Sequence, residues 1–243
     1  MRTSDPLAKD WNLYRTRHFI IYYDKAPLDF VKNVEDMAEY HFESITRSLG
    51  FPRYKSWSFD ERAKIYIFNN QDDYVEHGSA MSWSHGAASP RNRVIKTFPT
   101  SHGFFDSTLP HELGHIIFRE FVGHDVLLPV WFEEGIAIYQ EQARRFGSHN
   151  VVREAIREER FIPLNELTYN KLYRNKNSSE ITLFYAESAS IINYLISEHG
   201  QQRFKWLCER LRDGKSFEAA LVSVYPRFRS LEDLAEAWED FLK

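Results

Sequence analysis

The sequence predicts an α+β fold with a mixed, sheet-bearing first half and a helical second half. Short runs of β-branched and aromatic residues, which are typical of buried strands, are concentrated in about the first 100 residues. Beyond about residue 126, apolar residues recur at the three- and four-residue spacing of helices that bury one face. A chain of 243 residues with 43% hydrophobic residues is long enough to bury a substantial core.

Three strands, one long helix and one loop are predicted in the first half. The apolar runs Phe19–Tyr23, Lys64–Asn69 and Arg93–Phe98 have the composition of strands. Residues Asp29–Leu49 place apolar side chains on one face and predict a helix. The segment Ser79–Asn92 is rich in Ser, Gly, Ala and Pro and predicts a loop.

The second half is predicted to be almost wholly helical, with Gly or Ser at the breaks between helices. The predicted helices cover Ser148–Arg160, Phe184–His199, Gln201–Asp213, Phe217–Val224 and Leu231–Leu242. The polar segment Thr168–Glu180 is predicted to be a connector that lies over a cleft.

Residues with the chemistry of a metal site gather on a predicted helix in the middle of the chain, which Asp106 or Ser107 can cap. The five residues that begin at His111 read His-Glu-Leu-Gly-His. Residues four apart on a helix are about 6 Å apart along the axis and roughly 40° apart around it. The imidazoles of His111 and His115 can therefore point to one ion, and Glu112 lies beside them without having to bind it.

A second predicted helix, which Pro129 opens, carries two adjacent glutamates. Glu134 follows His115 after an eighteen-residue spacer and shares a helix face with Trp131, so its carboxylate is predicted to point inward. A buried carboxylate is costly unless a cation compensates it, and two imidazoles with one carboxylate form a zinc-binding set. The alternative is that Glu133 and Glu134 are both surface charges.

This pattern of His-Glu-x-x-His, eighteen residues and then Glu-Gly resembles that of the gluzincin superfamily of zinc metallopeptidases. The nine residues from Pro129, Pro-Val-Trp-Phe-Glu-Glu-Gly-Ile-Ala, are similar to a stretch of the small bacterial peptidases often called the MA-like family. The six residues from Tyr185, Tyr-Ala-Glu-Ser-Ala-Ser, resemble the segment that carries a transition-state-stabilising Tyr in aminopeptidase-type gluzincins. The similarity of pattern runs from about Phe19 to Trp238.

The resemblance implies a thermolysin-like zincin fold and a single metallopeptidase catalytic domain over residues 1–243. A sheet-bearing lobe is expected over residues 1–125 and a helical lobe over residues 126–243, with the active-site cleft between them.

The resemblance also implies one Zn²⁺ per chain, held by His111, His115 and Glu134. Glu112 is then the general base, and the hydroxyl of Tyr185 stabilises the oxyanion of the intermediate. Sequence spacing alone cannot bring Tyr185 to the metal, and its alternative role is that of an aromatic side chain that packs on a helix.

In gluzincins a strand just before the metal helix forms the sheet edge on which an extended peptide lies. Unpaired amides at such an edge can bind the backbone of a peptide. We therefore expect substrate beside the third predicted strand, at Val94, Ile95, Lys96 and Thr97.

The sequence departs from the family pattern at two points. Family members usually carry an acidic residue four positions after the ligand Glu, where it supports a histidine ligand, but Ile138 stands there. The sequence also lacks Gly-Ala-Met-Glu-Asn, the element that grips a substrate amino terminus in the aminopeptidase branch. Exopeptidase action of that type is therefore not indicated.

Composition and charge limit the classes of binding partner and the cellular compartments that we expect for this protein. A net charge of -4 gives no electrostatic case for binding nucleic acid or anionic membranes, so a peptide or protein is the expected partner. The single cysteine, Cys208, excludes an intrachain disulfide. The first six residues lack the apolar core of a signal peptide, so the sequence predicts a soluble, cytoplasmic protein, or an exported one if a leader has been removed.

Two functions from different classes are consistent with these observations. The first is a zinc metallopeptidase, most simply an endopeptidase, in which Glu112 activates water. The second is a catalytically inactive gluzincin-like protein that binds peptides or regulates a partner. Glu112 favours the first because a structural metal site needs no general base, and Ile138 is the main indication of the second.

Overall fold

A computed structural model of the protein describes residues 10–51, 57, 61–77, 87–99, 103–169 and 178–243. It confirms the predicted α+β class, with the strands in the first half and helices in the second. The chain divides into two compact units, the first made of Met1–Thr46 and Pro52–Ile117 and the second of Arg47–Phe51 and Phe118–Lys243. The predicted connector at residues 168–180 falls mostly outside the described residues.

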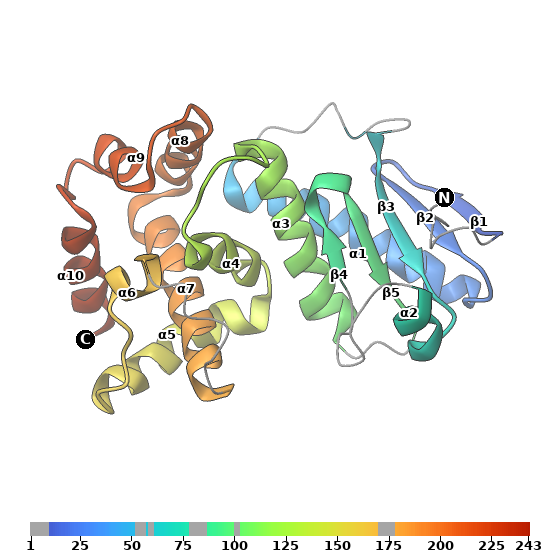
Figure 1. Ribbon diagram of the computed structural model, residues 1–243, viewed down its shortest axis with the longest axis horizontal. Helices are drawn as coiled ribbons and strands as arrows, with labels where there is room; N and C mark the ends of the chain where they lie inside the picture. Colours follow the sequence, from blue (N-terminus) through green and yellow to red (C-terminus); the bar gives the residue numbers. More distant parts are fainter. Residues whose placement is uncertain (1–9, 52–56, 58–60, 78–86, 100–102, 170–177) are drawn as a thin grey trace, which may run out of the picture. The chain divides into compact units, whose positions relative to one another are not determined.

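The first unit contains a mixed five-stranded sheet with the order β1-β2-β3-β5-β4 (Figure 1). Its strands are β1 (Asn12–Arg15), β2 (Phe19–Tyr23), β3 (Ala63–Ile67), β4 (Ala87–Ser89) and β5 (Val94–Thr97). The three central strands β2, β3 and β5 are parallel, and β1 and β4 pair antiparallel at the two sides. The three strands predicted from apolar runs are confirmed within about two residues, because these are the buried central strands.

Burial in the centre of the sheet explains why these runs form strands. Ile21, Ile65 and Ile95 lie in register on adjacent strands, and all three side chains are fully buried. Helix α1 (Leu28–Leu49) packs on β2 through an edge-to-face contact between Phe42 and Phe19, with 6.3 Å between ring centroids. The predicted helix is thus confirmed. A short helix, α2 (Gln71–His77), was not predicted.

The prediction that β5 is a sheet edge is wrong. Strand β4 pairs with β5 on the side away from β3, with Ala88 opposite Ile95, so the backbone of β5 is hydrogen-bonded on both sides. Ile95 and Thr97 are also 0% exposed and cannot contact a bound peptide through their side chains. Among the described strands, β4 is the edge on this side, and it lies within the segment that was predicted to be a loop.

Helix α3 (Leu109–Val122) carries the His-Glu-Leu-Gly-His sequence and is continuous across the boundary between the two units, which falls after Ile117. A π-helical turn, η3 (Phe104–Thr108), precedes it, so Asp106 and Ser107 lie inside helical structure and do not cap the helix as predicted. The helix ends at Gly123, which has a φ of +107° and donates its backbone N–H to Arg119.

In its described residues the second unit is built from helices alone after α3 (Figure 1). These are α4 (Val130–Tyr139), α5 (Gln142–Arg157), α6 (Leu164–Tyr169), α7 (Ser178–His199), α8 (Gln201–Arg212), α9 (Phe217–Val224) and α10 (Leu231–Leu242). The four C-terminal helices, α7 to α10, agree with the sequence predictions, except that α7 starts earlier. Helix α5 begins six residues earlier than predicted, and α6 was not predicted. None of the described helices is both long and apolar enough to cross a membrane.

Helix α4 is fixed in the second unit by its two large aromatic residues. The indole of Trp131 donates a 2.9 Å hydrogen bond to the hydroxyl of Thr168 on α6. Phe132 makes edge-to-face ring contacts with Phe118 of α3 and Phe217 of α9, at centroid distances of 5.8 and 5.0 Å. Both side chains are fully buried, so α4 lies in the core of this unit and not on its surface.

Helices α4 and α7 approach each other closely at Gly135. A Cβ atom built on Gly135 would lie 2.4 Å from the backbone oxygen of Ser188 and 2.8 Å from a side-chain carbon of Ile192. Neither atom can move without shifting α7, because one belongs to its backbone and the other to a fully buried side chain. Glycine at position 135 is therefore required by packing, independently of any role of its neighbour Glu134.

We expect Gly135→Ala to lower the free energy of unfolding by about 1–3 kcal/mol, because the added methyl group overpacks the contact between α4 and α7. Gly147→Ala in α5 is the matched control, since a Cβ there meets nothing within 4 Å. Gly147→Ala should raise the free energy of unfolding by about 0.5–1 kcal/mol, because alanine favours a helix more than glycine does. Urea denaturation followed by circular dichroism measures both, and equal stabilities for the two variants would contradict the packing account.

Candidate metal centre

The two histidines of α3 point to a common position. Their Nε2 atoms are 3.1 Å apart, and their rings are nearly perpendicular, with 4.8 Å between centroids. Two nitrogens that each lie about 2.05 Å from a tetrahedral zinc ion are separated by about 3.3 Å. The arrangement of His111 and His115 is therefore close to that of two ligands of one ion.

Helix α3 buries its apolar residues and leaves the histidines on a different, half-buried face. Leu113, Ile116 and Ile117 are all fully buried, whereas His111 and His115 are half-buried. The helical period of 3.6 residues places the apolar residues on one side and leaves the two histidines one turn apart on another. Glu112 is also half-buried and follows His111 by about 100° around the helix axis.

Glu134 of α4 completes a set of three metal-binding side chains. One ligand atom from each of His111, His115 and Glu134 lies within 4.8 Å of the others. Two imidazole nitrogens and one carboxylate oxygen form one of the common protein donor sets of catalytic zinc sites, whereas calcium and magnesium sites are built mainly from oxygen. The chemistry of the three donors therefore fits zinc.

The neighbouring Glu133 has a different partner. Arg119 of α3 binds both oxygens of its carboxylate, and the Nε–Oε1 distance is 2.7 Å. Arg119 also donates a 2.8 Å hydrogen bond to the backbone oxygen of Val126 in the connection between the helices. This bidentate pair holds α4 against the helix that carries His115, one turn before Arg119. The sequence pattern distinguished the inward-facing Glu134 from Glu133 but did not identify Arg119 as the partner of Glu133.

Tyr185 of α7 lies within electrostatic reach of Glu134. Burial, and secondly the negative charge of Glu134, raise the pKa of the Tyr185 hydroxyl above its ordinary value. Both effects disfavour the phenolate. The hydroxyl therefore stays protonated at neutral pH and can donate a hydrogen bond.

An apolar cavity of about 620 Å³ adjoins Tyr185. Its lining residues come from α4, α5 and α7 and are Ile138, Ala143, Arg144, Gly147, Ser148, Val151, Ser178, Ile181, Thr182, Tyr185 and Ala186. Ile138, which replaces the acidic residue of the family pattern, is buried and forms part of this apolar wall. Arg144 is paired with the buried Glu141 at 3.4 Å, and the sequence analysis had not singled out either residue.

Comparison with known proteins identifies the family of the chain. The family model described as the Peptidase MA superfamily matches residues 57–243, which include α3, α4 and α7. The comparison with curated proteins gives no match. Because the family model covers more than half of the chain, the chain belongs to the Peptidase MA superfamily.

Proposed function

We propose that this protein is a zinc-dependent endopeptidase whose catalytic domain comprises both units. The observation that carries the proposal is the convergence of one ligand atom each from His111, His115 and Glu134 within 4.8 Å, with Glu112 adjacent on α3. Zinc, when bound by these three residues, supplies a Lewis acid that polarises the peptide carbonyl and lowers the pKa of water to about 7.

Glu112 is the proposed general base. It takes one proton from the attacking water and delivers it to the amine that leaves when the peptide C–N bond breaks. One side chain can serve both steps because the proton it accepts in the first is the proton it returns in the second. General acid–base catalysis of this kind contributes about 100- to 10,000-fold to the rate.

Tyr185 is the proposed donor to the developing oxyanion. Its half-buried hydroxyl can donate a hydrogen bond as negative charge forms on the former carbonyl oxygen.

Two features are proposed to bind the peptide. The edge strand β4 offers backbone groups of Ala87–Ser89 to an extended chain, in place of the interior strand β5. The cavity beside Tyr185 has mainly apolar walls and is large enough for a bulky apolar side chain. The absence of the Gly-Ala-Met-Glu-Asn element favours cleavage within a chain over removal of its first residue.

The second candidate function is a catalytically inactive, peptide-binding protein of the same superfamily. Ile138 favours it, because an apolar, buried residue at this position cannot support a histidine ligand by hydrogen bonding. Activity and metal affinity distinguish the two candidates.

The two adjacent glutamates should respond differently to the same substitution. Glu134→Gln should reduce zinc affinity by more than the ~10–100-fold typical of outer-shell changes, because it removes a ligand. Glu133→Gln should retain about one zinc per chain and lose about 1–3 kcal/mol of stability, because it weakens the pair with Arg119. Zinc titration with a competing chelator and urea denaturation test both. Equal zinc affinity in the two variants would remove Glu134 from the ligand set.

Glu112→Gln should abolish peptide hydrolysis while leaving the zinc content unchanged. The amide has nearly the size of the carboxylate but cannot accept the proton of water. The measurement is cleavage of a mixed peptide library, read by mass spectrometry, beside metal analysis of the same samples. Equal turnover by wild type and Glu112→Gln contradicts the mechanism, and zinc binding without cleavage by the wild type supports the inactive candidate.

Tyr185→Phe should lower kcat by about 100-fold with a small change in KM, because the lost hydrogen bond forms only as the oxyanion develops. Tyr194→Phe is the matched control, since this Tyr lies on the same helix and does not line the cavity beside Tyr185. A change in KM alone, or equal effects of both substitutions, would show that Tyr185 serves packing.

A further inference from the structure

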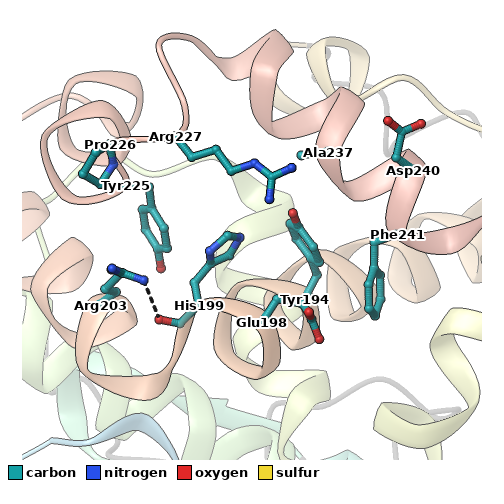
Figure 2. Close-up of a pocket in the computed structure, with 10 residues that line it drawn as sticks. All are labelled: Tyr194, Glu198, His199, Arg203, Tyr225, Pro226, Arg227, Ala237, Asp240 and Phe241. Carbon is teal, nitrogen blue, oxygen red and sulfur yellow. Dashed lines mark hydrogen bonds between the residues drawn. The ribbon is translucent and has the colours of Figure 1, made fainter.

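A second cavity, of about 570 Å³, lies in the helical unit near the C-terminal end of α7 (Figure 2). Its lining residues come from α7, α8, α10 and the segment after α9, and are Tyr194, Glu198, His199, Arg203, Tyr225, Pro226, Arg227, Ala237, Asp240 and Phe241. None of them belongs to the proposed catalytic machinery. The volume lies in the range of about 300–1,000 Å³ that small-molecule sites occupy.

His199 lies among aromatic rings in this cavity. Figure 2 shows its imidazole between the rings of Tyr194 and Tyr225, and both contacts are edge-to-face, with centroid distances of 5.2 and 5.4 Å. Phe241 extends the aromatic wall through a tilted contact with Tyr194 at 5.1 Å. Such walls suit the apolar body of a small organic molecule.

Two buried polar atoms in this wall have no hydrogen-bond partner among the described residues. They are the hydroxyl oxygen of Tyr225, whose side chain is 1% exposed, and Nε2 of His199. Buried polar groups in folded proteins are nearly always hydrogen-bonded, because an unpaired group loses its interaction with water without compensation. Both atoms are covered by the surrounding side chains, so the two residues contribute their rings and not these atoms to the cavity wall.

The cavity also carries two guanidinium groups. Arg203 donates a 3.4 Å hydrogen bond to the backbone oxygen of His199, and Arg227 forms no ion pair with a described residue. Burial lowers the pKa of His199, and Arg203 and Arg227 lower it further, each by more than the carboxylate of Glu198 raises it. The two arginines therefore outweigh Glu198 at the imidazole, so the electrostatic potential there favours a negative charge.

We propose that this cavity binds a small organic molecule that carries a carboxylate or phosphate group on an apolar body. The anionic group pairs with Arg227, while the apolar body packs on Tyr194 and Phe241. An inorganic anion alone would leave most of the cavity unfilled. The proposal does not depend on peptidase activity.

Four probes with one apolar body test the proposed chemistry: 3-phenylpropionate, 3-phenylpropyl phosphate, 3-phenylpropanol and 3-phenylpropylamine. Ligand-observed NMR with the full-length protein should show a Kd on the order of 1 mM or tighter for the carboxylate, the phosphate or both. The alcohol and the amine should bind at least about tenfold more weakly. Comparison of the two anions identifies which group the cavity takes. Equal affinity for the alcohol, or no binding of either anion, overturns the proposal.

Substitutions test whether the anionic probes bind in this cavity. Arg227→Gln should weaken binding of the preferred anion by about tenfold, whereas Arg210→Gln, an exposed arginine of α8 that does not line the cavity, should leave it unchanged. Anion affinity that is equal in wild type and Arg227→Gln contradicts the assignment even if both proteins are folded.

Discussion

The buried position of α4 is the constraint on which the rest of this structure depends. Seven of its ten residues are buried, among them Trp131, Phe132 and Gly135, and Gly135 lies against α7. Its two glutamates must therefore enter surroundings where a carboxylate needs a positively charged or hydrogen-bonding partner. Glu133 finds that partner in Arg119, and the proposed zinc site supplies one for Glu134.

The packing of α4 against α7 and α3 also positions the groups that are proposed to act together with Glu134. The small size of Gly135 lets α7 approach α4, and α7 carries Tyr185 within electrostatic reach of Glu134. The bidentate contact of Arg119 joins α4 to the helix that carries the two histidines. The proposed site takes groups from three helices, and a close backbone contact and an ion pair, both made by residues next to Glu134, help to hold these helices together.

Residue patterns predicted most of the fold because buried elements leave strong local signals. Strands β2, β3 and β5 are apolar runs, and the C-terminal helices show regular apolar spacing between Gly or Ser breaks. Strand β4 reads Ala-Ala-Ser and has no such signal, so only its pairing with β5 makes it a strand, and the substrate edge was misplaced for that reason. Helical geometry predicted that His111 and His115 share one direction, and the resemblance to gluzincins added Glu134 from a second helix. The contacts of Arg119, and the proximity of Tyr185 to Glu134, depend on tertiary packing that spacing does not encode.

The central claim is that two imidazoles and one carboxylate share a zinc ion. X-ray absorption at the zinc edge, measured on the full-length protein loaded with one equivalent of zinc, tests it most directly. The account predicts two imidazole nitrogens at about 2.0–2.1 Å, oxygen ligands that include a carboxylate, and no sulfur. Zinc surrounded by oxygen alone, or a spectrum that is the same in wild type and His111→Ala, would contradict it.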